Sequence, residues 1–509
     1  MTQYSRRPND RYQTRRQGGP QNGRQAPRQS RQYRSDPYQS AGRGRRSRQP
    51  MPAHSSRPQR RRRSAWPIVV AVLFVAVVGV GAFFVLRSCG NNAASTVDGQ
   101  AAGEQAAQVG QGNTNATATE DGTTQASTTG KNKDGSVDID LLMVGDMLFH
   151  YQVRMSGLKA DGTRNYDHLF THFVDELDGK DIKVLNQETP IAGNIYTGSA
   201  PDGYDGYPEF NGPQEVGDAE AKAGFNVILK ATNHAMDNAS NFSDPYTLVR
   251  SEQTFWKTKH PEVAVIGEVD PDDDEASVDD VYVFEKDGFK VALLNYTQDL
   301  NGNEGFDTQG VVSMLEEEHV KKTMAKAREL ADMIVVFPHW GEEYTTEPVE
   351  MQYEWAQVFI DEGADVIIGN HPHVIEPVTA LEGEDGNKVP CFWSTGNYIS
   401  TSPEDGNEEV HPLVGGAAEV TLHKDADGTC SVTAASFKPL VSHQGESTDM
   451  TTYLAKDYTD DLAATNGIDT EINPGKDDSE LTPAVVHEFC ASVLGSGYDK
   501  TTGVYELKL

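Results

Sequence analysis

Cysteine is scarce in this sequence, since the 509 residues contain only four. Four cysteines are too few for a disulfide-dense scaffold, and the 47 glycines show no triplet period, which excludes a collagen-like chain. Lysine is absent from residues 1–64, where all 18 basic residues are arginine and only two residues are acidic. Residues 88–509 have the opposite balance, with 25 basic and 75 acidic residues. A single, evenly mixed globular domain is therefore excluded.

One long apolar run stands between these two charge blocks. Ala65–Leu86 contains 22 residues without a charged side chain, and as a helix it would cross a hydrocarbon core of about 30 Å. Arginines crowd its N-terminal side and only Arg87 follows it, which predicts an N-terminus inside the cell and residues 88–509 outside. A cleaved signal peptide fits less well, because the run is long and 64 residues precede it. We predict a single-pass transmembrane helix in the cell membrane.

The segments on either side of this run contain few apolar residues. We expect residues 1–64 to form a disordered cytoplasmic tail, because they offer too little apolar surface to offset the entropy of ordering. Their arginines could bind nucleic acid, but the adjoining helix favours contact with the anionic lipid bilayer, so no nucleic-acid partner is expected. Residues 87–136 are predicted to be a flexible linker, since residues 91–136 contain no aromatic side chain.

Strand-like and helix-like segments alternate from Val137 onward. The predicted strands are Ile139–Val144, a strand ending at Val184–Leu185, Asn226–Leu229, Val263–Ile266, Val281–Phe284, Val291–Asn295, Met333–Phe337 and Val366–Ile368. The predicted helices are Glu215–Ala223, Leu315–Leu330 and Met351–Glu362. This alternation predicts a layered α/β domain over residues 137–445, closed by a hairpin of Ala417–His423 and Cys430–Phe437. An acidic extension over residues 446–509 follows, with a terminal helix at Pro483–Leu494.

The cysteines of this part leave two possibilities open. Cys391 and Cys430 lie in strand-like segments that we expect to adjoin, and a disulfide is permitted outside the membrane. The alternative is that both, together with Cys490, remain unpaired thiols.

Polar side chains follow five of the apolar strands directly. They are Asp146, Glu188, Asn233, His234, His339, His371 and His373. Because the carboxyl ends of the strands in an α/β sheet lie along one edge, we expect these side chains to meet in one site. Each histidine alone could be an ordinary hydrogen-bonded residue, but five strand ends with the same chemistry favour a polar site. Carboxylate, amide and imidazole groups suit divalent Zn, Mn or Fe, and two ions bridged by a carboxylate would activate water for attack at phosphorus.

Eight short motifs, in this order, resemble the CapA-type family of capsule and poly-γ-glutamate synthesis proteins. They are Val144-Gly145-Asp146-Met147-Leu148, Asn186-Gln187-Glu188-Thr189-Pro190, Phe210-Asn211-Gly212-Pro213, Ala223-Gly224-Phe225, Thr232-Asn233-His234-Ala235-Met236-Asp237, His339-Trp340-Gly341-Glu342-Glu343-Tyr344, Gly369-Asn370-His371-Pro372-His373-Val374 and Ser394-Thr395-Gly396-Asn397-Tyr398. The resemblance covers about residues 137–400 and implies a layered α/β/β/α domain similar to the calcineurin-like metallophosphoesterase fold.

The resemblance also implies a role for each matching residue. Metal ligands would be Asp146, Glu188, Asn233, His339, His371 and His373, with His234 as the general acid. Two motifs depart from the superfamily pattern. Asp146 is followed by Met147-Leu148 where that pattern has Asp-x-His, and the nearest histidine is His150. Asn-Gln-Glu at residues 186–188 also stands where Gly-Asp-x-x-Asp is usual.

Three further acidic residues are candidates for the catalytic machinery. Glu342 and Glu343 follow a strand directly and could supply a base or a ligand, or simply belong to a solvated loop. Asp237 could orient His234 or cap a helix. The segment Asn194–Gln214, with four aromatic residues among Gly, Asp and Pro, is predicted to be either a lid over the site or a packed surface loop.

The resemblance implies a membrane-anchored, extracellular protein that acts in the synthesis of capsule or poly-γ-glutamate. Its site would hydrolyse a phosphoester, or cut or transfer an amide, with divalent metal ions as cofactors. A non-catalytic scaffold or polymer-guiding subunit of a membrane synthase is the alternative, because the first metal motif is altered. A tethered nucleotidase is a lesser possibility.

Overall fold

The computed structural model describes residues 125–128, 132–195, 203–383, 386–401, 411–445, 450–467 and 481–509. All of them belong to the compact unit Gln108–Leu509. No helix among these residues is long and apolar enough to cross a membrane. The predicted tail 1–64, the predicted transmembrane helix 65–86 and the predicted linker up to residue 124 lie outside the described residues.

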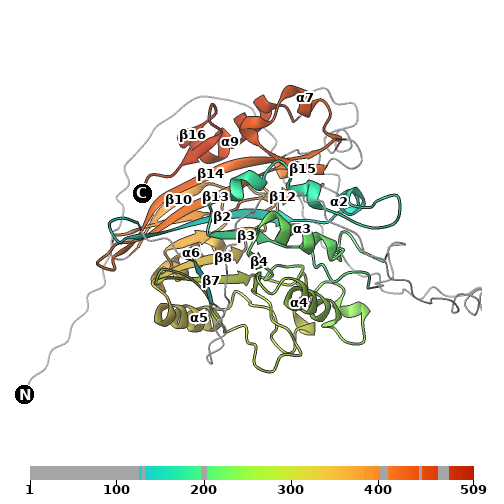
Figure 1. Ribbon diagram of the computed structural model, residues 1–509, viewed down its shortest axis with the longest axis horizontal. Helices are drawn as coiled ribbons and strands as arrows, with labels where there is room; N and C mark the ends of the chain where they lie inside the picture. The colour runs from blue at the N-terminus through green and yellow to red at the C-terminus, as the bar shows by residue number, and fades with distance from the viewer. Residues whose placement is uncertain are drawn as a thin grey trace, which may run out of the picture. The chain divides into compact units, whose positions relative to one another are not determined.

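The strands of the described residues form two sheets (Figure 1). In spatial order, the seven-stranded sheet consists of β1 (Gln125–Thr128), β6 (Tyr282–Lys286), β7 (Phe289–Thr297), β8 (Met333–His339), β9 (Val366–Ile368), β11 (Lys388–Phe392) and β10 (Val378–Glu382). Its central strands β7, β8, β9 and β11 are parallel to one another. Since parallel neighbours end at the same edge, residues that follow these strands are brought together there.

The second sheet has ten strands. In spatial order it consists of β16 (Tyr498–Asp499), β17 (Val504–Glu506), β14 (Cys430–Gln444), β13 (Val414–Lys424), β2 (Val137–Met147), β3 (Ile182–Asn186), β4 (Val227–Leu229) and β5 (Ala264–Ile266), while β12 (Asn397–Ile399) pairs with β2 and β15 (Met450–Leu454) pairs with β14. The strands β2 to β5 are parallel. The predicted hairpin is present as β13 and β14, and it adds antiparallel strands beside β2.

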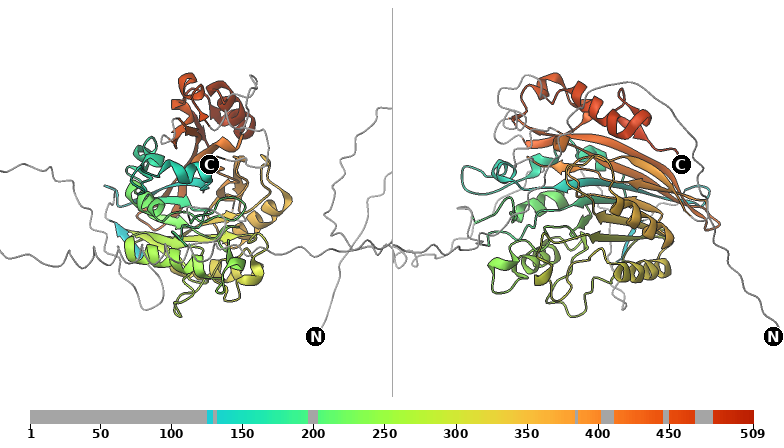
Figure 2. Two further views of the ribbon diagram at one scale, coloured as in Figure 1. Left: turned by 90° about the vertical axis from the view of Figure 1, so that its right-hand side faces the viewer. Right: turned by 180° about the vertical axis from the view of Figure 1, so that it is seen from behind.

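Helices lie on the outer sides of the two sheets. They are α2 (Tyr151–Ser156), α3 (Glu215–Ala223), α4 (Thr247–Lys259), α5 (Glu317–Leu330), α6 (Glu350–Asp361), α7 (Asp460–Ala463) and α9 (Pro483–Leu494). Helix α5 packs on β7 and β8, whereas α7 and α9 lie beyond β14 on the opposite side (Figures 1 and 2). The prediction of a layered α/β domain is confirmed to the extent that the chain is mixed α/β with two sheets.

Alternate side chains of the seven-stranded sheet face two different cores. Val335 and Phe337 of β8 belong to the large core that also contains residues of the ten-stranded sheet. Ile334 and Val336 belong to a second core, together with Met324 of α5. Strand residues point alternately to the two faces of a sheet, so the inward face buries the contact between sheets and the outward face buries the helices.

Helix α3 and helix α9 begin and end at the predicted residues. Gly224 closes α3 in the left-handed conformation, at φ +107°, which a glycine adopts without a steric penalty. The Thr482 side chain accepts a hydrogen bond from the backbone N–H of Val485 at the start of α9, and Pro483 occupies the first helical position. Local capping chemistry therefore set these boundaries.

Helix α4 was not predicted from the sequence. This helix buries the polar side chains Glu252 and Gln253 together with the apolar Leu248, Phe255 and Trp256. Buried polar residues interrupt the apolar period of 3.6 residues by which such a helix is recognised.

The expectation that Cys391 and Cys430 lie on adjoining strands is wrong. Cys391 belongs to β11 of the seven-stranded sheet and Cys430 to β14 of the ten-stranded sheet. Both are free, as is Cys490. The hairpin that contains Cys430 pairs with β2 instead, because its alternating apolar face completes the larger sheet.

Three buried glutamates, Glu220, Glu252 and Glu268, lie near the buried Lys230, which directly follows β4. Lys230 and Glu252 form an ion pair of 3.1 Å, and both side chains are almost completely buried. Burial, followed by the nearby charge of Glu252, raises the pKa of Glu220 to about 8 and that of Glu268 to about 8. Glu220 therefore holds its proton at neutral pH in the folded protein.

We predict that replacing Glu220 by Gln makes stability less dependent on pH. The folded protein keeps the Glu220 proton up to about pH 8, whereas the unfolded chain releases it near pH 4.5. Between these values the folded state binds more protons, so the free energy of unfolding falls as pH rises, by about 1.4 kcal/mol per pH unit for one proton. Urea denaturation of Glu220→Gln between pH 5 and pH 8 should show a smaller fall than the wild type. The exposed control Glu354→Gln should follow the wild type, and an equal fall in Glu220→Gln would contradict the prediction.

Candidate metal centre

The predicted site residues meet where strands of both sheets end. The ten-stranded sheet provides Asp146 at the end of β2, Glu188 after β3, and Asn233 and His234 after β4; the seven-stranded sheet provides His339 at the end of β8, and His371 and His373 after β9. Every one of these seven residues is at most 6% exposed. The structure thus brings all seven strand-end residues into one buried cluster.

A close approach of two backbones places Asp146. A Cβ atom on Gly145 would lie 1.8 Å from the carbonyl oxygen of Gly396, so only glycine fits there. The backbone N–H of Asp146 donates to that same carbonyl, and the following β12 pairs with β2 so that Asn397 stands opposite Asp146. The Gly-Asp sequence therefore lets β2 and β12 enter the site side by side.

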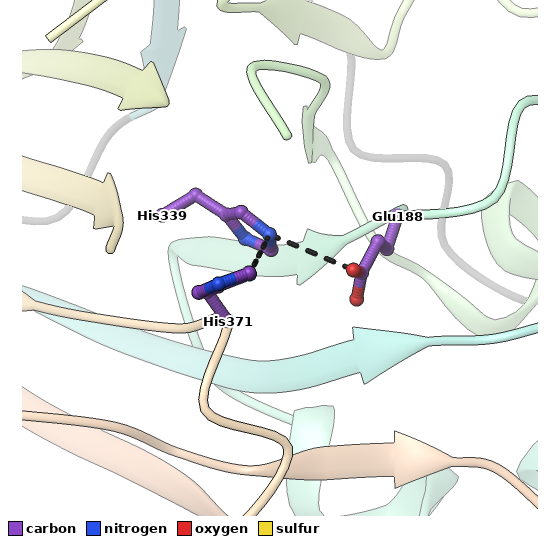
Figure 3. A group of neighbouring side chains, drawn as sticks. All are labelled: Glu188, His339 and His371. Carbon is purple, nitrogen blue, oxygen red and sulfur yellow. Dashed lines mark hydrogen bonds and ion pairs between the residues drawn. The ribbon is translucent and has the colours of Figure 1, made fainter. Parts of the chain in front are cut away.

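Glu188 is the centre of the cluster. Its Oε1 lies 3.6 Å from His339 Nε2, 3.7 Å from His373 Nε2 and 3.9 Å from His234 Nε2. Figure 3 shows the Glu188 carboxylate pointing toward His339, with His371 beside His339. Neither carboxylate oxygen has a hydrogen-bond partner among the described residues, although the side chain is fully buried. Burial alone would raise the pKa of Glu188, but the surrounding imidazoles outweigh it and hold this pKa well below its usual range.

Two groups of potential metal ligands share Glu188. One group is Glu188, His339 and His371, and the other is Asp146, Glu188 and His373; within each, the ligand atoms lie within 4.8 Å of one another. A carboxylate shared by two ligand groups is the arrangement that bridges a pair of metal ions. Buried oxygens that lack hydrogen-bond partners, surrounded by imidazole nitrogens, fit divalent Zn, Mn or Fe.

Asn233 adds an amide oxygen beside the first ligand group. Its Oδ1 lies 2.9 Å from His339 Nε2. His371 Nδ1 lies 3.2 Å from the same His339 nitrogen, so three potential donor atoms converge at one point. Such converging ligand atoms are what a metal site requires, and Asn233 lies in the cluster, as expected from its position after a strand.

The two histidines of the His-Pro-His turn have unusual backbones and opposite pKa shifts. His371 and His373 have φ values of +99° and +59°, which residues other than glycine rarely adopt. Residues with such backbone angles are concentrated at functional sites. Burial and then the neighbouring His339 and His373 lower the pKa of His371 well below its usual value, so its imidazole is neutral, the form that binds metals. Burial opposes protonation of His373 as well, but Glu188 and Asp146 raise its pKa to about 10.

His234 and Asp237 form a buried hydrogen-bonded pair. Asp237 Oδ2 accepts from His234 Nδ1 at 2.7 Å and also from the backbone N–H of Phe210 at 2.6 Å. Burial would lower the pKa of His234, but the Asp237 carboxylate raises it above its usual value. The ring edge of His234 packs against Phe210, with centroids 4.8 Å apart. Asp237 thus fixes the orientation of His234 and leaves its Nε2 facing Glu188.

The other candidates lie at the rim or outside the cluster. Glu342 and Glu343 are exposed and belong to neither ligand group, although the charge of Glu343 contributes to the raised pKa of His373. His150 is buried, but its ring packs on Phe210 at 5.3 Å and it also belongs to neither group.

The predicted aromatic segment 194–214 has packed side chains in the part that the structure describes. Tyr204 and Phe210 are buried, and Tyr207 is 49% exposed. Tyr196 lies outside the described residues. Because Phe210 packs on His234, the described part of this segment forms a wall of the site, as a packed loop does.

Three asparagines that were not predicted to be site residues also line the cluster. Asn186 donates to Asp146 Oδ1 at 2.7 Å, Asn397 Oδ1 lies 3.1 Å from His373 Nδ1, and Asn301 Nδ2 lies 3.3 Å from His234 Nδ1. Asn186 and Asn397 stand inside motifs that carry the family resemblance, so their motifs contained a signal. Asn301 lies in an Asn-Gly turn with φ +54°, which predicts a turn and gives no sign of the site.

Comparison with known proteins places this chain in a family. Residues 140–402, just over half of the chain, match the family model described as "Bacterial capsule synthesis protein PGA_cap". The chain is 30% identical over 179 residues to the PGA biosynthesis protein CapA of Bacillus subtilis, covering 34% of this chain and 42% of that protein. It is 26% identical over 266 residues to the capsule biosynthesis protein CapA of Bacillus anthracis, covering 51% of this chain and 59% of that protein. The chain therefore spans less than two thirds of either relative.

Two solved structures show weaker likeness. They are GAP50, described as the anchor in the inner membrane complex of Plasmodium (10% identity, TM-score 0.27, 58% of this chain and 87% of that chain), and purple acid phosphatase PPD1 from yellow lupin (10% identity, TM-score 0.24, 62% and 54%). Neither likeness carries an argument about this chain at such TM-scores. The match over residues 140–402 is decisive: this chain belongs to the PGA_cap family of bacterial capsule synthesis proteins.

Proposed function

We propose that this protein acts in the synthesis of a cell-envelope polymer, capsule or poly-γ-glutamate, through a divalent metal centre at the ends of the strands. The names of the two Bacillus relatives support the process. The single observation that supports the metal centre is the buried Glu188 carboxylate, which two groups of potential ligands share. The predicted transmembrane helix 65–86 would hold this domain outside the cell membrane, where such a polymer accumulates.

The proposed chemistry is hydrolysis or transfer at a phosphoester or amide, within a metallophosphoesterase-like domain. Bound divalent ions would supply an activated water and stabilise developing negative charge. His234 would deliver a proton to the leaving group, because its Nε2 faces the cluster and Asp237 fixes its Nδ1. Asp237 is a positioning residue in this proposal.

One observation favours a second candidate function, that of a non-catalytic scaffold or polymer-guiding subunit of a membrane synthase. Position 148, where the metallophosphoesterase pattern that the chain resembles has a ligand histidine, is a leucine, and the nearest histidine, His150, packs on Phe210. The group of Asp146, Glu188 and His373 would then hold its ion with fewer protein ligands. A metal centre without turnover would serve to order the polymer or a partner.

We predict that the purified protein binds two Mn²⁺ or Zn²⁺ ions. The substitution Glu188→Gln should lower the affinity of the protein for both ions. Loss of a residue that only hydrogen-bonds to a metal ligand weakens metal binding by about 10–100-fold. Loss of the shared carboxylate, which is itself a ligand, should therefore weaken metal binding by about 100-fold or more. Metal content after dialysis, measured by elemental mass spectrometry, checks this. Glu347→Gln, an exposed change on the loop after β8, is the matched control and should bind as the wild type does. Wild-type protein that retains no divalent ion would refute the metal centre.

We predict that a strain lacking this protein regains no polymer when it expresses His371→Ala, and little when it expresses His234→Gln. Loss of a general acid lowers turnover by about 10²–10⁴-fold while leaving the ligands in place. Polymer is measured on cells that contain equal amounts of each variant, with Glu347→Gln as control. Full polymer from the double variant His234→Ala, His371→Ala would reject the catalytic function and favour the scaffold.

A further inference from the structure

A buried ion pair lies directly against the turn that presents Glu188. Lys230 follows β4 and Glu252 belongs to α4, and their side chains are 0% and 1% exposed. The Lys230 Nζ lies 3.1 Å from Glu252 Oε1. Neither residue belongs to the ligand groups or to the His234–Asp237 pair, so the proposed chemistry does not use them.

Both members of the pair also bind the backbone of this turn, one on each side of Glu188. Lys230 Nζ donates to the carbonyl oxygen of Gln187 at 3.0 Å. The backbone N–H of Ile191 donates to Glu252 Oε2 at 3.2 Å. The ion pair therefore joins the residue before Glu188 to the residue three positions after it.

Glu188 depends on its backbone for its position more than its neighbours do. Its two carboxylate oxygens have no hydrogen-bond partner among the described residues, whereas Asp146 receives a hydrogen bond from Asn186. The backbone of Glu188 itself makes two hydrogen bonds: its N–H donates to the carbonyl oxygen of Asn186 at 3.1 Å, and its carbonyl accepts from Thr232 Oγ1 at 3.4 Å. Whatever fixes the turn thus fixes the shared carboxylate.

A contribution to stability alone does not explain why these two buried residues are charged. Replacing a buried ion pair by apolar residues of similar volume is often neutral or stabilising, so stability alone gives little reason for two buried charges here. An apolar pair could not donate to the Gln187 carbonyl or accept from the Ile191 amide. These two hydrogen bonds are what the charged pair adds.

We propose that Lys230 and Glu252 are positioning residues that clamp residues 187–191 and so hold Glu188 where both ligand groups share it. This inference rests on the metal centre of the proposed function. Loosening the clamp should lower the affinity for both metal ions together, because Glu188 belongs to both ligand groups.

The test compares full-length Lys230→Met and Glu252→Gln with the wild type and with a control. Met324→Ala removes buried volume from the second core beneath α5 and lowers stability without touching the turn. Amide hydrogen exchange of the peptide covering 187–191 is measured without metal, and Mn²⁺ is then titrated and followed by electron paramagnetic resonance, which separates coupled ion pairs from single ions. Circular dichroism identifies variants that fold.

We expect faster exchange over 187–191 in both clamp variants, Mn²⁺ binding weakened by about 10–100-fold, and a reduced coupled-pair signal, with none of these changes in Met324→Ala. If residues 187–191 of a folded clamp variant exchange their amide hydrogens at the wild-type rate, the inference is overturned, even if metal binding is normal. Faster exchange with wild-type Mn²⁺ affinity overturns it also, because the clamp would then not position Glu188. If the wild type binds no Mn²⁺, the metal centre and this inference fail together, whereas the other two results leave the metal centre standing. Should Lys230→Met not fold, Glu252→Gln decides.

Discussion

One buried carboxamide, that of Asn295 in β7, joins the two sheets beside the metal centre. Its Oδ1 accepts from the backbone N–H groups of Lys230 and Ala231 after β4, at 3.1 and 2.7 Å. Its Nδ2 donates to the carbonyl oxygen of Phe337 in β8 at 2.8 Å. One planar amide thus holds both strand ends, and losing it would deprive the buried N–H of Ala231 of its acceptor, at a cost of about 1–3 kcal/mol. The two halves of the site depend on this contact for their relative position.

The composition of the site follows from that constraint. Asn233 lies two residues after the segment that Asn295 holds in one sheet, and His339 lies two residues after the carbonyl that it holds in the other. Their side chains meet with 2.9 Å between Asn233 Oδ1 and His339 Nε2. Glu188, which follows β3, is fully buried, and its Oε1 lies 3.6 Å from His339 Nε2. A buried carboxylate is costly unless positive charge or donors surround it, and here the imidazoles and any bound cation serve that purpose.

Sequence could predict the strand ends but not the supports behind them. Asp146, Glu188 and His339 could be found because each follows an apolar run, and the topology of parallel strands brings such positions together. The role of Asn295 could not, because the backbone groups that it binds are 42 and 64 residues away in the sequence. Glu252 could not be predicted either, because a buried charged residue within α4 interrupts the apolar period by which a helix is recognised. Contacts between sheets are non-local, and a pattern along the chain does not record them.

Charge gives the proposed function its sharpest physical requirement. Residues 88–509 hold 75 acidic and 25 basic side chains, and several of the basic ones are already paired, as Lys257 is with Asp270 and Asp273. An anionic polymer such as poly-γ-glutamate would meet repulsion that reaches about 8–10 Å at physiological salt. Divalent ions held at Glu188 would reverse the sign of the potential locally, at the one place where a reacting group must arrive. In an acidic domain of this kind, the metal centre would thus provide attraction for the polymer as well as chemistry.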